Sequence, residues 1–196
     1  MKKIIIAGIT GQDGSLLYDY LKNKKFKIIG LSRRNHNNKH IIKTDYSSKS
    51  LSKIINSFKP DEIYNFSGLS KPSISWKKIR ETLESNLYIT INFLEIIKRQ
   101  KKIKFFNSSS SEIFKDTKNK LHENSAIYPS NPYGIAKSSS HFLIDAYRKK
   151  YNLFLVNGIF FNHASIKTKN DFLLKYLKIN FKKLKKKKIK KINIMD

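Results

Sequence analysis

The chain has 196 residues, of which 39% are hydrophobic and 12% aromatic, a composition that supports a packed domain and not a disordered chain. It has no cysteine and only five scattered histidines, so we expect neither a disulfide framework nor a metal site. The formal net charge of +27 would suit a nucleic acid, but the lysines are spread throughout, which favours a compositional bias. No stretch approaches the ~20 apolar residues of a membrane span, so we expect a cytoplasmic protein without a membrane partner.

Short apolar runs alternate with helical patterns along the chain. We expect strands at 3–7, 27–31, 62–67, 104–109 and 154–161, and helices at 15–23, 51–58, 79–98 and 132–150. Asn131 and Pro132 mark the start of the last of these helices. A helix over 171–181 and a short strand over 189–194 are expected near the end. The alternation predicts an α/β fold with a doubly wound parallel sheet, whose ligand crevice lies at the carboxyl ends of the strands.

A glycine-rich segment with the spacing G-x-x-G-x-x-G connects the first strand to the first helix. Glycines there allow a tight turn and let backbone N–H groups approach a pyrophosphate at the helix N-terminus. Because the strand–turn–helix context is present, we favour a dinucleotide site over an ordinary glycine turn. Its predicted residues are Gly8, Ile9, Thr10, Gly11, Gln12, Asp13 and Gly14.

The end of the second strand indicates which dinucleotide binds. Arg33 and Arg34 stand where an NAD-preferring site would place an acid, and a guanidinium suits the 2′-phosphate of NADP(H). Two solvated surface charges are the alternative. Asp45 and Tyr46 precede the second helix, where an acid can accept from the adenine amino group. An ordinary turn aspartate explains Asp45 about equally well.

Two groups of residues could carry acid–base chemistry. Tyr133 and Lys137 have the i, i+4 spacing that places both on one face of a helix, where the Lys charge lowers the phenol pKa and the Tyr can exchange a proton with a substrate hydroxyl. Ser110 and Glu112 directly follow the fourth strand, where a hydroxyl can bind a substrate oxygen and a carboxyl can move a proton on and off carbon. The alternative for this second group is a Ser-rich capping loop.

Four segments together resemble the GDP-mannose 4,6-dehydratase family, of the extended short-chain dehydrogenase/reductase superfamily with its Rossmann-like fold. They are GITGQDGS (8–15), NSSSSEIF (107–114), YPSNPYGIAK (128–137) and NGIFFNH (157–163), and the resemblance covers most of residues 1–165.

The resemblance implies a reaction on GDP-mannose or a related sugar nucleotide with NADP as cofactor. Hydride leaves C4 of the sugar for NADP⁺ while Tyr133 takes the hydroxyl proton. Glu112 removes the C5 proton, water leaves from C6, and the hydride returns to C6. Ser110 stands where the family has Thr, and Lys137 would orient the ribose. The resemblance also places further residues in the cofactor site, namely Arg33, Asp45, Tyr46, Ser67 in the 66–70 turn, and His163.

The chain also departs from the family. Residues 164–169 read ASIKTK where the family has E-S-P-R-R-G, residues 67–71 read SGLSK in place of A-A-x-S-H, and the family continues beyond Asp196. The resemblance therefore implies an NADP-binding domain over 1–165 and, over 166–196, the start of a substrate lobe that is mostly missing. We expect a fragment, a truncated product or a decayed copy that turns over GDP-mannose poorly or not at all on its own.

Three other functions stay open. An epimerase or 4-keto reductase of the same superfamily is one, although Glu112 favours a dehydratase. A non-catalytic nucleotide-binding remnant is the second. A nucleic-acid-binding protein is the third, resting on the basic run 182–191, which a solvated tail explains better. The helices 79–98 and 132–150 are expected to pair with their copies in a homodimer or higher homo-oligomer.

Overall fold

The computed structural model describes residues 1–114, 117, 119–168, 170, 172–189 and 191–192, and of Leu173 and Leu174 only the backbone. The chain divides into two compact units, Met1–Phe161 and Asn162–Asp196. Every motif predicted to bind cofactor or carry chemistry lies in the first unit, with the exception of His163.

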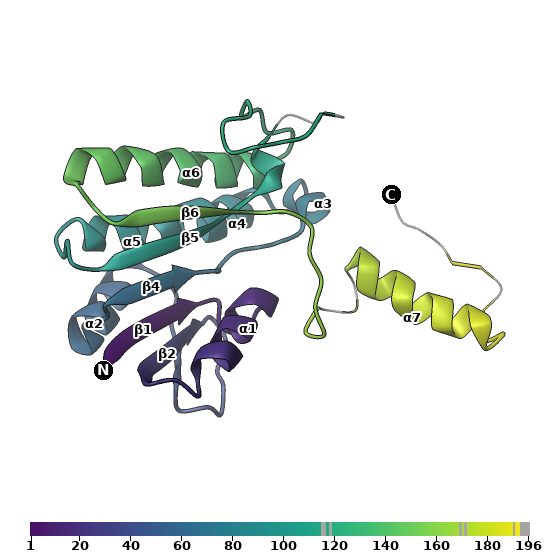
Figure 1. The fold of residues 1–196 in the computed structure, drawn as a ribbon, viewed down its shortest axis with the longest axis horizontal. Helices are drawn as coiled ribbons and strands as arrows, with labels where there is room; N and C mark the ends of the chain where they lie inside the picture. The colour runs from purple at the N-terminus through teal and green to yellow at the C-terminus, as the bar shows by residue number, and fades with distance from the viewer. Residues whose placement is uncertain (115–116, 118, 169, 171, 190, 193–196) are drawn as a thin grey trace. The chain divides into compact units, whose positions relative to one another are not determined.

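The first unit is built on a six-stranded sheet whose neighbouring strands are all parallel, in the order β3-β2-β1-β4-β5-β6 (Figure 1). The strands are β1 (Lys2–Ala7), β2 (Phe26–Ser32), β3 (Ile41–Lys43), β4 (Glu62–Asn65), β5 (Lys104–Ser110) and β6 (Leu155–Phe160). The strand order changes direction at β1, so a crevice is expected where the chain leaves β1 and β4. The predicted doubly wound parallel sheet is confirmed, with β3 as an additional short strand.

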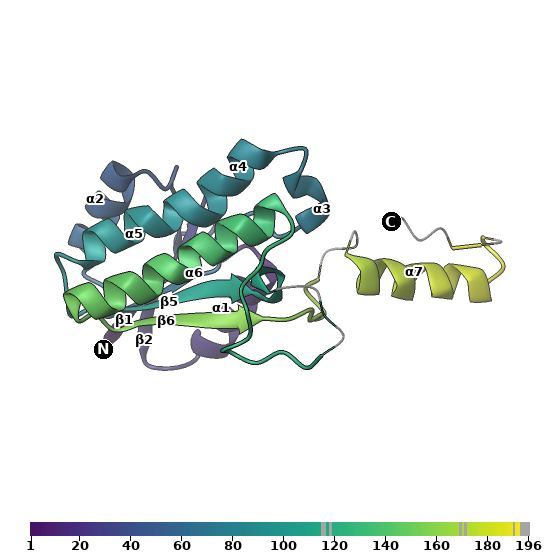
Figure 2. The ribbon, with the colours of Figure 1, turned by 90° about the horizontal axis from the view of Figure 1, so that it is seen from above.

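Helices cover both faces of this sheet. They are α1 (Gln12–Leu21), α2 (Ser48–Phe58), α3 (Pro72–Ser75), α4 (Ile79–Leu83), the π-helical turn η1 (Glu84–Tyr88), α5 (Ile89–Ile97), the 3₁₀ turn η2 (Ser111–Ile113) and α6 (Pro132–Tyr151). In Figure 2, α2, α5 and α6 lie on one face and α1 on the other.

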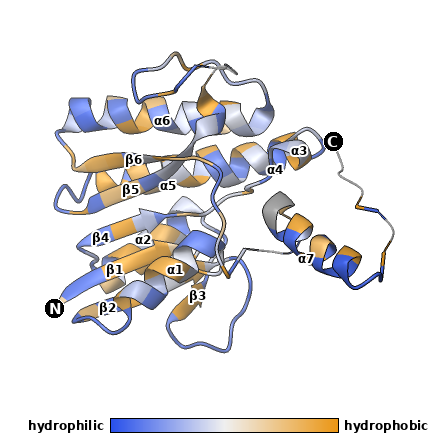
Figure 3. Cartoon of the chain, turned by 45° about the vertical axis from the view of Figure 1, so that its right-hand side comes forward, coloured by the Kyte–Doolittle hydropathy of each residue, from blue (hydrophilic) through white to orange (hydrophobic). Residues whose placement is uncertain are grey.

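Alternate strand residues supply the two cores. Ile5 and Ile63 belong to the larger core with α2, α5 and α6, whereas Ile4 and Ile6 pack with α1. Much of the orange, hydrophobic ribbon in Figure 3 accordingly lies in the strands.

The long helix predicted over 79–98 is one continuous helical segment, α4–η1–α5, but its first half turns an unexpected face inward. Ile79 on the predicted apolar stripe is 47% exposed, and the buried residues of α4 and η1 are polar, namely Thr82, Ser85 and Asn86. Small side chains allow the close approach of α6, whose Ser140 hydroxyl donates to the Asn86 carbonyl over 2.7 Å. Ile79, at the start of the stripe, therefore faces outward, while Leu83 and Leu87 are half-buried.

The second unit contains one helix, α7 (Leu173–Lys185), over much of the range predicted as helical. Phe181 and Leu184 on this helix are exposed. Ile189, Lys191 and Ile192 are not in a strand, and the rest of the strand predicted over 189–194 lies outside the described residues. Within the described part of the chain, no helix is long and apolar enough to cross a membrane.

Candidate functional site

The glycine loop lies between β1 and α1. Gly8 has a φ of 76°, a left-handed conformation that favours glycine, and a Cβ there would lie 2.6 Å from the Phe66 carbonyl oxygen. A Cβ on Gly14 would lie 2.5 Å from the Gly8 carbonyl oxygen. Helix α1 therefore packs directly on the loop. Gly11 is its N-cap and provides no side-chain cap, a geometry that suits an anion at the helix N-terminus.

Tyr46 supports this loop from within the fold. Its hydroxyl donates to the Leu31 carbonyl oxygen over 2.9 Å and accepts from the Gly8 amide over 3.2 Å. The side chain is only 3% exposed, and burial raises its pKa to about 12. The predicted cofactor residue Tyr46 therefore ties the end of β2 to the glycine loop through its hydroxyl.

The three charged residues predicted near the adenosine end are all exposed. Arg33 and Arg34 follow β2, and within the described part of the chain neither guanidinium has an ion pair. The Asp45 carboxylate accepts from the Ser47 amide at the start of α2 over 2.9 Å, and hydrogen bonds from Ser50 and Ser47 lower its pKa. This contact gives Asp45 a local structural role.

Tyr133 and Lys137 lie on the first turns of α6, and both are buried. Lys137 Nζ donates to the Ser108 carbonyl oxygen at 2.8 Å and lies 5.7 Å from the Tyr133 ring centroid. Burial lowers the Lys137 pKa to about 8 and raises that of Tyr133. The expectation of a lowered phenol pKa is therefore wrong for the chain alone, because desolvation by burial is the largest influence and raises this pKa.

The charges around the Tyr133 phenol show which elements meet there. After burial, the largest influence on its pKa is the Ser110 hydroxyl, which lowers it, followed by the carboxylates of Glu112 and Asp13, which raise it. Ser110 ends β5, Glu112 lies in η2, and Asp13 lies in the first turn of α1, within the glycine-rich segment. Residues predicted separately as catalytic and as cofactor-binding thus influence the pKa of one phenol.

The Ser110–Glu112 turn is held in place by local hydrogen bonds. The Ser110 hydroxyl accepts from the Glu112 amide over 3.2 Å, which is the capping role considered for this serine. The Glu112 carboxylate accepts from Asn131 Nδ2 over 2.8 Å. Ser67 also lies at a strand end, after β4, and its hydroxyl donates to Asn65. His163 belongs to the second unit, so its assignment to the cofactor site stays a prediction.

Asn86 has a role that the sequence did not reveal. It lies in the π-helical turn η1, and its side-chain amide donates to the Leu69 and Thr82 carbonyl oxygens, each over 3.1 Å. Its buried Oδ1 has no hydrogen-bond partner among the residues that the structure describes, and it lies 2.2 Å from where a Cβ on Gly68 would be. Asn86 therefore holds the 66–70 turn after β4 beside α6. The only sequence signal was a polar residue within an apolar helical pattern.

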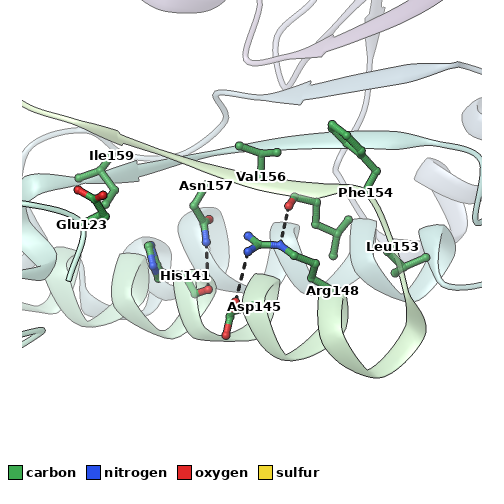
Figure 4. A pocket seen from close by; sticks show the side chains of 10 residues that line it. Glu123, His141, Asp145, Arg148, Leu153, Phe154, Val156, Asn157 and Ile159 are labelled. Atoms are coloured by element: carbon green, nitrogen blue, oxygen red, sulfur yellow. Dashed lines mark hydrogen bonds and ion pairs between the residues drawn. The ribbon is translucent and has the colours of Figure 1, made fainter.

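A separate hollow of about 480 Å³ lies between α6 and β6, and none of the predicted site residues lines it (Figure 4). Its polar side chains serve to join the two elements. Arg148 Nε donates to the Leu155 carbonyl oxygen over 2.8 Å, and Asn157 Nδ2 to that of His141 over 3.1 Å. Within the described residues there is no cluster of His, Asp and Glu that could hold a metal ion.

Comparison with known proteins identifies the family of this chain. The family described as "GDP-mannose 4,6 dehydratase" matches residues 5–195. The GDP-mannose 4,6 dehydratases of Cricetulus griseus and Homo sapiens are 35% and 34% identical to this chain. The matches cover 88% and 86% of this chain, but only 53% and 52% of the two relatives. The chain thus spans about half the length of these relatives.

Solved structures share the fold. A UDP-glucuronic acid 4-epimerase from Bacillus cereus, in complex with NAD, superposes with a TM-score of 0.82 at 23% identity, over 94% of this chain and 63% of the epimerase. A dTDP-glucose 4,6-dehydratase from Bacillus anthracis superposes with a TM-score of 0.79 at 21% identity, and the match covers 93% of this chain and 62% of that dehydratase.

The fold is a Rossmann-like parallel sheet, and the family match places the chain in the extended short-chain dehydrogenase/reductase superfamily. Within that superfamily, the chain belongs to the GDP-mannose 4,6-dehydratase family.

Proposed function

We propose that this chain provides the NADP(H) site and the acid–base residues for dehydration of GDP-mannose to GDP-4-dehydro-6-deoxy-mannose. The main support is that the Ser110 hydroxyl and the charges of Glu112 and Asp13 all act on the pKa of the Tyr133 phenol, so that the acid–base groups lie within electrostatic reach of the start of α1. Family membership supports the reaction class, a hydro-lyase acting on a sugar nucleotide.

The residues of the loop fit a dinucleotide. The absence of side chains at Gly8 and Gly14 brings the loop backbone against β4 and α1, and the N-terminus of α1 suits a pyrophosphate. The exposed guanidinium groups of Arg33 and Arg34 suit a 2′-phosphate, so we infer a preference for NADP(H). When bound, the nicotinamide would accept a hydride from the sugar and later return it.

Four side chains share the acid–base work. Tyr133, as the phenolate that the Lys137 charge stabilises, takes the proton of the C4 hydroxyl, and Ser110 donates a hydrogen bond to the oxygen left behind. Lys137 keeps a positive charge beside the phenol at pH 7, because its pKa of about 8 lies above that pH. Glu112 removes the proton at C5, which the neighbouring C4 carbonyl makes acidic, and the C6 hydroxyl leaves as water.

The test is incubation of the protein with NADP⁺ and GDP-mannose, with the 4-keto product followed by its absorbance in alkali. We expect Tyr133→Phe and Glu112→Gln each to lower the rate by roughly 10²- to 10⁴-fold, the usual contribution of a positioned acid or base. Tyr20→Phe, at an exposed tyrosine in α1, is the matched control and should leave the rate unchanged. Cofactor binding without any product would favour the alternative, a non-catalytic nucleotide-binding protein.

A further inference from the structure

The Asn131 side chain makes two hydrogen bonds with different purposes. Its Oδ1 accepts from the Gly134 amide over 2.9 Å, which caps α6. Its Nδ2 donates to Glu112 Oε2 over 2.8 Å, across 19 residues of sequence. Capping requires only the oxygen, since Ser, Asp and Asn cap helices about equally well. At α2 the hydroxyl of Ser47 performs that role. The hydrogen bond from the Asn131 amide nitrogen to Glu112 is therefore not required by the helix cap.

The start of α6 is also packed against the backbone of the Glu112 turn. A Cβ on Gly134 would lie 2.4 Å from the Glu112 carbonyl oxygen, so only a glycine allows this approach. The Tyr128 amide donates to the Ile113 carbonyl oxygen over 2.9 Å. These contacts fix the backbone of the turn relative to the helix that carries Tyr133. The Asn131 amide is the contact that acts on the carboxylate itself.

We propose that Asn131 is a positioning residue that orients the Glu112 carboxylate for its proton transfer at C5. This inference rests on the proposed function and extends it to a residue beyond the acid–base set. The amide engages Oε2, while Oε1 has no hydrogen bond to any described residue and is the oxygen that takes the proton. A carboxylate held by one oxygen has fewer orientations available, and misplacement of a reacting group by about 1 Å costs ~10²-fold in rate.

The experiment separates the C5 step from the C4 step. The protein is incubated with NADP⁺ and GDP-mannose in D₂O. During C5 exchange the C5–H bond breaks, its electron pair moves into the C4 carbonyl as an enolate, and Glu112 returns a deuteron acquired from solvent. Deuterium at C5 therefore reports the Glu112 step, and absorbance of the reduced cofactor reports hydride removal at C4.

The variants are Asn131→Ser and Asn131→Asp, which keep a capping oxygen but lose the amide NH₂ group that reaches Glu112. We expect deuterium uptake at C5 to fall by roughly 10- to 100-fold. The reduced cofactor should accumulate, because C4 is still oxidised while the next step is slowed. The midpoint of urea unfolding should stay at the wild-type value, because the helix cap remains.

Asn152→Ala is the matched control, because Asn152 ends the same helix at a φ of 51° and lies away from Glu112 in sequence and along the helix. It should weaken α6 without changing the ratio of deuterium uptake at C5 to the absorbance of the reduced cofactor. An equal loss of deuterium uptake in Asn152→Ala would overturn the positioning role while leaving the proposed function intact. An unchanged ratio of deuterium uptake to reduced-cofactor absorbance in Asn131→Ser would do the same. A wild-type protein that takes up no deuterium during prolonged incubation would overturn the proposed function, and the role of Asn131 with it.

Discussion

At the residue scale, Lys137 is the side chain whose burial has the clearest measurable consequence. It is 6% exposed, and its ammonium donates to the Ser108 carbonyl oxygen. Its pKa of about 8 lies below the ordinary value of 10.5, because burial penalises the charged form. Between these two values the unfolded chain binds more protons than the folded chain, so folding stability should rise with pH.

The prediction concerns the pH dependence of unfolding. The free energy of unfolding should increase between pH 8 and pH 10, by on the order of 2 kcal/mol. Above pH 10 it should fall again, because the pKa values of Tyr46 and Tyr64 are raised to about 12 and the unfolded chain loses those protons first. Urea titrations at several pH values measure this, and Lys137→Met should abolish the rise. A wild-type curve that is flat from pH 8 to pH 10 would contradict the burial of a titrating lysine.

Some site residues could be predicted from the sequence and others could not. The glycine loop and the pair Tyr133–Lys137 are visible because their spacing is local. Asn86 and the second hydrogen bond of Asn131 depend on partners brought close only by the tertiary fold. The direction of the Tyr133 pKa shift was likewise missed, because it depends on burial.

At the element scale, the glycine loop makes a specific prediction about the contact between β1 and α1. Gly14→Ala should lose cofactor binding and destabilise the fold, because the new Cβ would meet the Gly8 backbone at 2.5 Å. Gly11→Ala is the control. Its φ of −78° is ordinary, and the nearest atom to the new Cβ is at 3.2 Å, so it should fold with a small loss of stability. Thermal unfolding and cofactor titration of both variants test this, and equal behaviour would refute the close-packing argument.

The elements differ in how far the sequence predicts them. Long periodic segments such as α6 were predicted almost to their ends because a cap and a proline mark the start. The three-residue strand β3 escaped prediction because such a short apolar run has no period. The inward face of α4 and η1 was not predictable, because Thr82, Ser85 and Asn86 are buried there while Ile79 and Tyr88 face outward.

At the scale of the whole molecule, that outward face supports the proposed homodimer. Ile79, Tyr88, Ile135 and Phe142 are between 47% and 57% exposed on α4, η1 and α6. We expect a dimer by sedimentation at micromolar concentration, and a monomer for Phe142→Asp, because a buried charge without a partner is strongly unfavourable. Phe154→Asp, at a phenylalanine that is also 57% exposed but lies next to β6, should remain dimeric. A monomeric wild type would contradict the pairing of these helices.

Every role proposed for the site requires NADP(H) at the glycine loop, so calorimetric titration with NADP⁺ and NAD⁺ is the decisive measurement. We predict tighter binding of NADP⁺, because Arg33 and Arg34 provide guanidinium groups for the 2′-phosphate. Arg33→Ala should narrow the difference in binding free energy between NADP⁺ and NAD⁺ by about 1–3 kcal/mol, the range for charged hydrogen bonds. Absence of binding, or NAD⁺ bound as tightly as NADP⁺, would contradict the assignment of this site.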